Sequence, residues 1–485
     1  MKNLLVGMSY KNHLQFIKTY ADQNVICDGD ICLSYSDLTE LMSDIDKLFS
    51  NDNKNSIYCL GVNVENSIRH AMIILYLLSE KINFYLISSS LSSNKNVPNF
   101  CDKIISVDKN EKSGVFSKNN YTICDNPNFN GEEMDIRPGQ ACVLFSSSGS
   151  SGKPKYICYS QHNLIQNAEN CLNRFQINSY SNILVSVPIG HMFGLGVGLL
   201  PGLLSGASFY LIEKNNIVKF LSARQKFNAS HTLLTPSLVN MILLLKKQGS
   251  YNGVFITAGE RINHRTYVLF EQNYGTLLNL YGCTELGAVG VASEKEIDKE
   301  ERAAGFVRPL PNVEIKVSQD QNGEILCKHN AGFVSYVDEN GILIHASRPK
   351  NIWYETNDIG FYDPTKGLKV IGRKDNCINR LGFLISLDEV ENLLKENFSQ
   401  IIEAIVFESI ADNAITTKIV AVCQVDENCD ININELKKKC SLLINKHYIP
   451  DDIYLIKSMP RLDSGKPDRN FLITKYKSNH FKIKR

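Results

Sequence analysis

The chain has 485 residues, of which 43% are hydrophobic and 21% are charged. This length exceeds what one compact core supports, and the hydrophobic content excludes a disordered chain, so two or more packed domains are expected. The 52 Lys and Arg residues against 51 Asp and Glu residues leave a formal net charge of +1. That balance excludes the broad basic surface of a non-specific nucleic-acid binder, and the basic tail Lys475–Arg485 is interpreted as solvated charge.

Cysteines and apolar runs bear on where the protein resides. The 14 cysteines are scattered from Cys27 to Cys440 without C-x-x-C spacing, which predicts reduced, mostly buried thiols in a cytoplasmic protein. The N-terminal run Leu4–Val6 is too short for a secretion signal. The segment Leu195–Ile212 has 18 residues without a charge, but its glycines and Pro201 favour a close-packed interior, so no membrane span is expected.

Apolar runs bounded by turn residues alternate with stretches of helical period, which predicts an α/β architecture with largely buried strands. A helix is expected over Asn66–Leu78. Strands are expected over Phe84–Ile87, Ala141–Phe145, Tyr156–Tyr159, Ile183–Val187 and Leu277–Leu280. Between Val313 and Ile371, short strands with turns at Asn322-Gly323 and Asn340-Gly341 predict a small β-rich subdomain.

The pattern changes again beyond Gly372. The sequence predicts a helix over Asp388–Leu394, strands over Ile401–Phe407 and Lys418–Val425, and a helix over Asn434–Lys446 that ends before Pro450. These elements form an α+β module of roughly 110 residues, the size of an independent domain. We therefore expect an N-terminal domain over residues 1–372, a C-terminal domain over 375–485 and a hinge near 373–376.

A loop rich in Gly and Ser lies between two of the strand signals, from Phe145 to Lys155. Its backbone N–H groups and hydroxyls can turn toward one anion, and its two lysines add positive charge, which predicts a phosphate-binding loop. It is not a Walker A loop, because Gly149 and Gly152 are three residues apart and Pro154 follows Lys153. A G-x-S-x-G nucleophile elbow is also absent.

This loop resembles the phosphate-binding signature of the adenylate-forming superfamily, which contains acyl- and aryl-CoA synthetases, luciferases and nonribosomal adenylation domains. The later signatures of that family follow in order: Pro188–His191, Thr257–Arg261, Tyr281–Glu285, Tyr354–Asp358, Gly372–Asp375, Gly382–Glu391 and Pro460–Arg469. The resemblance covers about two thirds of the chain. It implies a large adenylation domain followed by a small mobile α+β domain.

The resemblance also implies a reaction, in which a carboxylate attacks the α-phosphorus of ATP to give acyl-AMP and pyrophosphate, and a phosphopantetheine thiol then takes the acyl group. By resemblance, ATP and AMP contact Ser146, Ser147, Ser148, Gly149, Ser150, Ser151, Gly152, Lys153, Lys155, Gly259, Glu260, Tyr281, Gly282, Thr284, Asp358 and Arg373. Lys466, Thr284 and His191 are the expected catalytic residues. Glu285 would hold Mg²⁺, as a hard cation prefers carboxylate oxygen. Asp375 would be the hinge and Gly382 would line the thiol tunnel.

The sequence departs from the family pattern at several positions. Asn357 stands where Gly is usual before Asp358, and Asn is the best substitute for a Gly with positive φ, so the turn is expected to survive. Asn379, Tyr156 and Gln161 replace the usual Lys, Gly and His. These changes leave open a non-catalytic binding or scaffold protein on an adenylating fold. A kinase-like phosphotransferase, which would release ADP, is a further alternative.

The sequence gives less information about the carboxylic acid substrate and about the thiol that accepts the acyl group. The segment Val185–Ser208 contains no Asp or Glu to pair with a substrate ammonium, which disfavours α-amino acids because an unpaired buried charge is costly. An apolar acyl pocket that suits an aryl or fatty acid is expected from His191, Met192, Phe193, Gly194, Gly198 and Ala258. The acceptor is expected to be CoA or a separate carrier protein, and the sequence does not decide between them.

Overall fold

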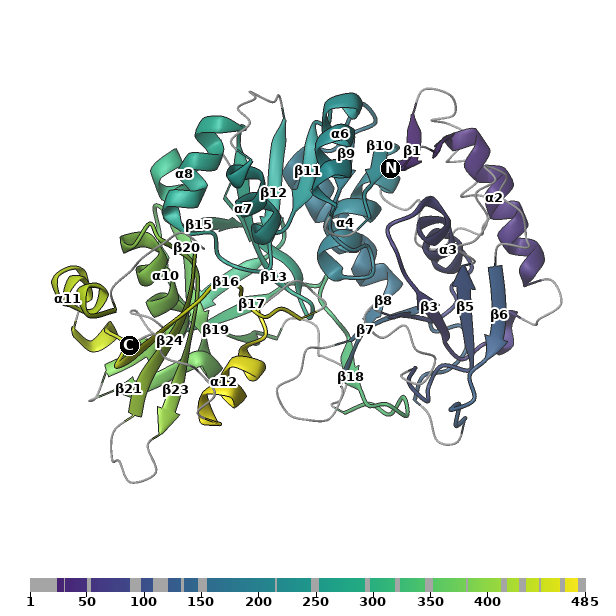
Figure 1. Ribbon diagram of the computed structural model, residues 1–485. Coiled ribbons are helices and arrows are strands. Elements are labelled where there is room, and N and C mark those ends of the chain that lie inside the picture. The colour runs from purple at the N-terminus through teal and green to yellow at the C-terminus, as the bar shows by residue number, and fades with distance from the viewer. Residues whose placement is uncertain are drawn as a thin grey trace.

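The structure is a computed structural model that describes residues 24–29, 31–49, 54–87, 97–107, 121–131, 135–146, 155–213, 216–245, 253–292, 297–318, 323–344, 352–380, 383–410, 417–426, 433–444, 446–462 and 467–478 (Figure 1). Its strands form sheets of thirteen, seven, two and three strands. The two large sheets come from residues before Lys374 and the two small sheets from residues after it. The α/β fold class expected from the sequence is thereby confirmed.

The larger sheet has the order β16–β17–β19–β20–β15–β14–β13–β12–β11–β9–β10–β1–β2. Its strands are β1 (Val25–Asp28), β2 (Ile31–Ser34), β9 (Asn182–Val185), β10 (Ser208–Leu211), β11 (His231–Leu234), β12 (Val254–Ala258), β13 (Leu277–Cys283), β14 (Gly287–Val291), β15 (Phe306–Pro309), β16 (Glu314–Val317), β17 (Gly323–Lys328), β19 (Tyr354–Asp363) and β20 (Gly367–Arg373). Of the strands between Val313 and Ile371, β16, β17, β19 and β20 join this sheet through β15.

The seven-stranded sheet has the order β18–β8–β7–β4–β3–β5–β6. Its strands are β3 (Leu60–Asn63), β4 (Phe84–Ile87), β5 (Lys103–Val107), β6 (Tyr121–Asp125), β7 (Cys142–Ser146), β8 (Tyr156–Ser160) and β18 (Ser335–Val337). The helices of the N-terminal part are α2 (Tyr35–Leu48), η1 (Lys54–Ser56), α3 (Ile68–Ser79), α4 (Gln161–Phe175), the π-helix η5 (Phe193–Leu199), α5 (Leu200–Ser205), α6 (Ile217–Phe227), α7 (Pro236–Leu244), α8 (His264–Asn273) and α9 (Lys299–Ala303).

Helices alternate with parallel strands in one half of the larger sheet. Strands β10, β9, β11, β12 and β13 run parallel to one another, and α6, α7 and α8 connect them in turn. These three helices cover one face, while α4, α5 and η5 contribute to the core on the other. All four residues of β11 are consequently buried, which explains why these strands are continuous apolar runs and not alternating ones.

Helix α3 is apolar on every side, and 11 of its 12 residues are buried. A helix of this kind must be enclosed, and α3 packs in the core that residues from both large sheets share. The hydroxyl of Ser67 accepts a hydrogen bond from His70 N and caps its first turn. The helix predicted over Asn66–Leu78 is confirmed.

The uncharged segment Leu195–Ile212 lies inside the protein. It forms η5, α5 and β10, and most of its residues have less than 9% exposure. A side chain at Gly202 would meet the ring of Phe209 at 2.1 Å, so the missing side chain allows α5 to approach β10. The interpretation as a close-packed interior is confirmed. None of the helices within the described ranges is long and apolar enough to cross a membrane.

The C-terminal part has its own core. Its elements are η6 (Lys374–Asn376), β21 (Cys377–Arg380), β22 (Phe383–Ser386), α10 (Leu387–Asn397), β23 (Ile401–Ile410), β24 (Thr417–Val425), α11 (Ile433–Leu443), η7 (Lys446–Tyr448), β25 (Asp452–Ile456) and α12 (Arg469–Lys477). Alternate residues of β23 and β24 face α10 and α11 on one side of the three-stranded sheet and α12 on the other. The expected small α+β domain is present.

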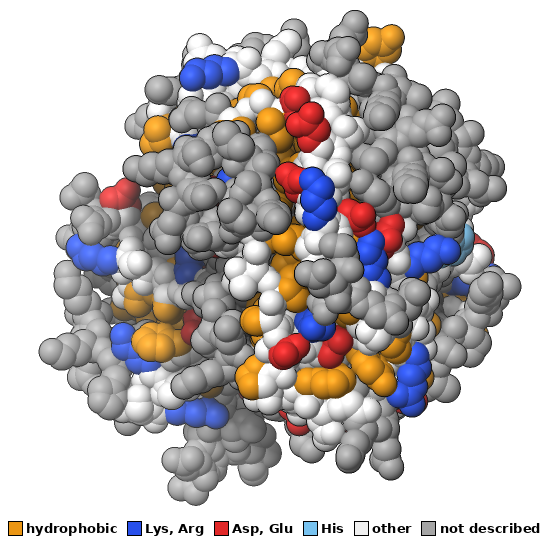
Figure 2. Space-filling view, turned by 90° about the vertical axis from the view of Figure 1, so that its right-hand side faces the viewer, with side chains coloured by type: hydrophobic (Ala, Val, Ile, Leu, Met, Phe, Trp, Pro, Cys, Tyr) orange, Lys and Arg blue, Asp and Glu red, His pale blue; other side chains and the backbone are white. Residues whose placement is uncertain are grey.

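The molecular surface shows no extended basic area where it can be seen. Figure 2 displays the side of the molecule that carries α2 and β6, and its acidic and basic side chains are interspersed with hydrophobic ones. This distribution agrees with a formal net charge of +1. It offers no broad positive face for a nucleic-acid backbone on this side.

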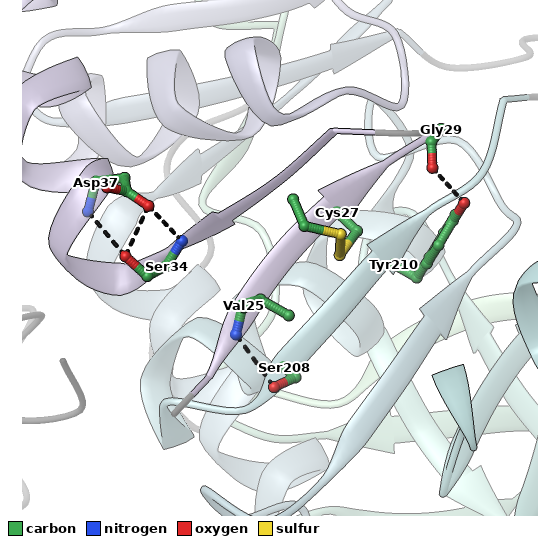
Figure 3. The surroundings of a disulfide bond; sticks show 8 residues. Val25, Cys27, Gly29, Ser34, Asp37, Ser208 and Tyr210 are labelled. Atoms are coloured by element: carbon green, nitrogen blue, oxygen red, sulfur yellow. Dashed lines mark hydrogen bonds between the residues drawn. A yellow bond between two sulfur atoms is a disulfide. The ribbon is translucent and has the colours of Figure 1, made fainter. Parts of the chain in front are cut away.

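The strands β1 and β2 are joined by a disulfide bond between Cys27 and Cys32 (Figure 3). The two residues are directly opposite in the antiparallel pair, and their Cα atoms are 4.1 Å apart. Such close pairs occur at the positions without backbone hydrogen bonds in an antiparallel ladder. The expectation that the cysteines are all reduced is therefore wrong for this pair, which joins the two strands of one hairpin.

We expect that replacing both Cys27 and Cys32 by Ala lowers the free energy of unfolding by about 2 kcal/mol, from the chain entropy of a short closed loop. Urea denaturation of the wild type and the double variant measures this difference. A reductant should lower the stability of the wild type to that of the variant and leave the variant unchanged. An oxidised wild type that is no more stable than the variant would contradict the prediction.

Candidate functional site

Several of the predicted site residues follow the carboxyl ends of parallel strands. His191 lies beyond β9, Gly259 and Glu260 follow β12, and the turn that holds Thr284 and Glu285 follows β13. Because these strands run parallel within one sheet, their carboxyl ends share one edge, where ligands of open α/β sheets usually bind. His191, Gly259 and Glu260 are exposed, so this edge is open to solvent.

At this edge, Asp358 of β19 contacts two other predicted site residues. The Tyr281 hydroxyl donates to Asp358 Oδ2 at 2.6 Å, and Arg373 Nη1 lies 3.5 Å from Asp358 Oδ1. Burial raises the pKa of the Asp358 carboxyl, and the Tyr281 hydroxyl and Arg373 charge oppose that rise. Burial and the nearby Asp358 also raise the pKa of Tyr281. The tyrosine therefore stays protonated and donates, which leaves Asp358 able to accept further hydrogen bonds.

The turn that presents Asp358 has the left-handed conformation expected from the sequence. Asn357 has φ +58°, a region that Asn tolerates better than most residues. The Asp358 N–H donates to Thr356 Oγ1 at 3.1 Å, and Thr356 Oγ1 donates to the carbonyl of Ile325 at 2.8 Å. The substitution of the usual Gly by Asn357 thus preserves the turn.

The turn after β13 is held by residues of the seven-stranded sheet. The Tyr159 hydroxyl donates to the Thr284 carbonyl at 2.8 Å, and Phe333 N donates to the Glu285 carbonyl at 2.7 Å. The Tyr336 hydroxyl donates to Glu285 Oε1 at 3.0 Å. These contacts, from β8, from β18 and from the segment just before β18, fix both the backbone of the turn and the carboxylate of Glu285.

The predicted phosphate loop connects the antiparallel strands β7 and β8, whose last pair before it is Ser146 and Tyr156. Residues 147–154 lie outside the described residues, as do Gly382 and Lys466. The described ends of the loop are Ser146, half-buried, and Lys155. The roles of this loop, of Gly382 and of Lys466 stay predictions.

The glycines near the expected acyl pocket have a packing role. A side chain at Gly194 would meet the Pro188 carbonyl at 2.2 Å, and one at Gly198 would meet Leu233 at 2.9 Å. Their missing side chains allow η5 to pack closely and leave no open slot on those sides. Met192 is buried and Phe193 half-buried. The assignment of these residues to an acyl pocket stays a prediction.

The predicted hinge residue contacts Arg373. Arg373 Nε lies 3.2 Å from Asp375 Oδ1, so this guanidinium is shared between Asp358 and Asp375. The backbone N–H of Arg373 also donates to Asp388 Oδ2 at 3.0 Å, which brings the start of α10 against the end of β20. Asp388 Oδ1 lies 3.6 Å from Arg469.

Two departures from the family pattern have structural explanations. Tyr156 packs edge-on against Phe100 and Tyr85, with ring centroids 5.0 and 5.4 Å apart. Gln161 is buried, and its amide donates to the carbonyl of Ile82 at 3.2 Å. Both side chains belong to the core around the seven-stranded sheet, so neither change removes a group from the site. The side chain of Asn379 lies outside the described residues.

Sequence reasoning missed Tyr159, Tyr336 and Glu324, which hold the site residues in place. Glu324 accepts a hydrogen bond from Asn357 N at 3.2 Å and pairs with Lys374 at 2.7 Å. No local pattern marks these residues, because each contacts a partner far away in the chain.

The sequence profile described as AMP-binding enzyme matches residues 81–336, just over half of the chain. The protein therefore belongs to the AMP-binding enzyme family, as the resemblance implied. It is 26% identical over 346 residues to indoleacetate–CoA ligase of Aromatoleum aromaticum, covering 69% of this chain and 67% of that protein. It is 25% identical over 359 residues to 4-coumarate–CoA ligase 1 of Narcissus pseudonarcissus, covering 69% and 64%. The matches thus span about two thirds of these ligases.

The fold is similar to solved structures over nearly its whole length. A crystal structure of the anthranilate CoA ligase AuaEII in complex with anthranoyl-AMP superposes with a TM-score of 0.80, at 16% identity, over 98% of either chain. The likeness includes the small C-terminal α+β part. It confirms the arrangement of a large N-terminal and a small C-terminal domain in this chain.

The left-handed turn leads to a prediction about Asn357. Asn357→Gly should leave the free energy of unfolding within about 1 kcal/mol of the wild type, since Gly adopts positive φ freely. Asn357→Val should lower it by about 2 kcal/mol, because a β-branched side chain is strained there. Thermal and urea unfolding of the two variants measures the difference. Equal stability of both variants would show that the turn is not left-handed in solution.

Proposed function

We propose that the protein activates a carboxylic acid with ATP. A carboxylate oxygen bonds to the α-phosphorus, the bond to pyrophosphate breaks, and an acyl adenylate forms. A phosphopantetheine thiol then attacks the acyl carbon and AMP leaves. The observation that carries this proposal is the cluster of Tyr281, Asp358 and Arg373 beside the turn of Thr284 and Glu285, in a member of the AMP-binding family.

In this proposal the nucleoside lies at the carboxyl edge of the larger sheet. Asp358 accepts hydrogen bonds from the ribose hydroxyls, a role that suits an ionised carboxylate. Arg373 closes over the ribose, and Tyr281 lies against the adenine. Gly259 supports this arrangement, because a side chain built there would have no neighbour within 4 Å, so the strand end at Gly259 and Glu260 faces open space. Gly282 completes this part of the site.

The phosphates and the carboxylate carry like charges, so the reaction needs cations and oriented donors where they meet. We assign the β- and γ-phosphates to the loop Ser146–Lys155 and the α-phosphate to Thr284. Thr284 is well suited to a fixed contact because Tyr159 holds its carbonyl. Lys466 and His191 would act where the acid meets the α-phosphate.

Mg²⁺ is proposed to bind at Glu285. Within the described ranges no group of three or more His, Cys, Asp or Glu side chains could hold a metal ion. Mg²⁺ in nucleotide enzymes takes one or two carboxylates together with phosphate oxygens and waters, so a single carboxylate fits. Tyr336 orients that carboxylate by its hydrogen bond to Oε1. The bound ion would neutralise charge on the phosphates.

The acid is proposed to be an aryl or fatty acid and not an α-amino acid. The segment Val185–Ser208 is fully described and has no Asp or Glu, so it offers no partner for a substrate ammonium. In the proposed pocket, the side chains of His191, Met192, Phe193 and Ala258 line the acid. The two relatives named above are ligases of aromatic acids, which supports the aryl class.

The acceptor is proposed to be the phosphopantetheine thiol of CoA or of a separate carrier protein. The names of the two relatives favour CoA. In the proposal, residues 1–372 form the adenylating domain and residues 375–485 the mobile domain, with the hinge at 373–376 and Asp375 as its pivot. Gly382 would line the tunnel by which the thiol enters.

Pyrophosphate exchange tests the first half-reaction. With ATP, Mg²⁺ and an accepted acid, labelled pyrophosphate should enter ATP, because adenylation is reversible before the thiol arrives. Across a panel of acids, aryl or medium-chain acids should exceed amino acids by at least roughly tenfold, or about 1.4 kcal/mol. Release of ADP would contradict ligase chemistry. No exchange with any acid, in a folded protein that binds ATP, would favour a non-catalytic scaffold.

Lys466→Ala tests the assignment of the catalytic lysine. The variant should adenylate a few hundred-fold more slowly, about 3 to 4 kcal/mol, because the lysine acts mainly on the transition state where the carboxylate meets the α-phosphate. ATP binding should change much less, since the nucleotide contacts lie in the N-terminal part. Thioester formation from synthetic acyl-AMP should persist. Equal loss of both half-reactions would make Lys466 a structural residue.

A further inference from the structure

Glu324 lies on β17 beside the turn that presents Asp358. Its Oε1 accepts a hydrogen bond from Asn357 N at 3.2 Å, and its Oε2 accepts one from Lys374 Nζ at 2.7 Å. The Glu324 side chain is only 12% exposed, whereas that of Lys374 is 54% exposed. The carboxylate is therefore the fixed member of the pair and the lysine reaches in from the surface.

One carboxylate thus contacts both β19 and the residue that follows its neighbouring strand β20. Asp358 of β19 and Arg373 of β20 are paired in register. Glu324 holds the residue before Asp358 by its backbone and the residue after Arg373 by its side chain. Arg373 in turn lies 3.5 Å from Asp358 Oδ1, so the contacts of Glu324 enclose the ion pair of Asp358 and Arg373.

The hydrogen bond from Asn357 N to Glu324 lies at a residue whose backbone conformation most residue types disfavour. Asn357 has φ +58°, which L residues other than Gly adopt only when their surroundings favour it. Asn357 directly precedes Asp358 in the chain. A rotation of the peptide at Asn357 would therefore turn Asp358 away from Tyr281. An acceptor for the N–H of Asn357 consequently fixes the direction of the Asp358 carboxylate.

We propose that Glu324 is a positioning residue for the ribose of the nucleotide, which it orients through Asn357 and Asp358 without touching the nucleotide. This inference rests on the proposed role of Asp358 in nucleotide binding. Lys374 holds Glu324 in place and balances its charge close to Asp358. Loss of Glu324 should therefore weaken the recognition of the ribose hydroxyls more than that of the base and phosphates.

The test compares the dissociation constants of ATP and of 2′,3′-dideoxy-ATP by isothermal titration calorimetry. The wild type should bind ATP at least roughly tenfold more tightly, because a carboxylate gains two hydrogen bonds from the diol. In Glu324→Ala this preference should fall below about threefold, while the affinity for dideoxy-ATP changes by less than about twofold. Glu324→Gln should recover part of the preference, since its amide oxygen can still accept from Asn357.

Lys366 offers a matched control. It pairs with Glu301 at 3.7 Å and is 45% exposed, and it lies on the turn between β19 and β20. Lys366→Met should keep the full preference for ATP, whereas Lys374→Met should lower it to a value between wild type and Glu324→Ala. These variants and Glu324→Gln preserve the test if Glu324→Ala does not fold.

Two outcomes would overturn different claims. If the wild type prefers ATP and the folded Glu324 variants keep that preference, or lose affinity for both nucleotides equally, then Glu324 does not position the ribose acid. If the wild type binds both nucleotides with equal affinity, then the ribose role of Asp358 is wrong, and the positioning role fails with it. The exchange assay then decides separately whether the protein forms adenylates.

Discussion

A buried carboxylate is stable only when hydrogen-bond donors or positive charges lie beside it. The residues around the buried carboxylate of Asp358 supply both. Tyr281 from β13 donates to one oxygen, and Arg373 from β20 lies beside the other. A carboxylate with one partner on each oxygen still has acceptor positions left, which suits the diol of a ribose. The geometry therefore combines strands from the parallel and antiparallel halves of the larger sheet at a single side chain.

The two large sheets are in contact at the turn after β13. Hydroxyl groups from the seven-stranded sheet bind this turn. Tyr159 and Tyr336 reach that turn from β8 and β18, and Tyr336 is also hydrogen-bonded to the Tyr354 hydroxyl at 2.9 Å. Tyr354 begins the strand that carries Asp358. The hydroxyls of Tyr336 and Tyr354 thus link Glu285 to the strand that carries Asp358.

Local features of the fold could be predicted from the sequence, and distant contacts could not. The helix at Ile68–Ser79 and the strand at Phe84–Ile87 follow from apolar periodicity. The left-handed turn at Asn357 follows from the family resemblance, which places Asn where Gly is usual. Tyr159 contacts a residue 125 positions away, and no pattern within either segment announces that pairing. The glycines of η5 show the same limit, because their sequence is equally compatible with an open pocket and with close packing.

The position of β18 has a consequence for how the chain assembles. This strand, Ser335–Val337, lies between β17 and β19 in the sequence, yet it pairs with β8 in the other sheet. The seven-stranded sheet begins with β3 near residue 60, so it must wait for its last strand until most of the polypeptide has been synthesised. The exposed edge of β8 would meanwhile be open to mispairing on the ribosome.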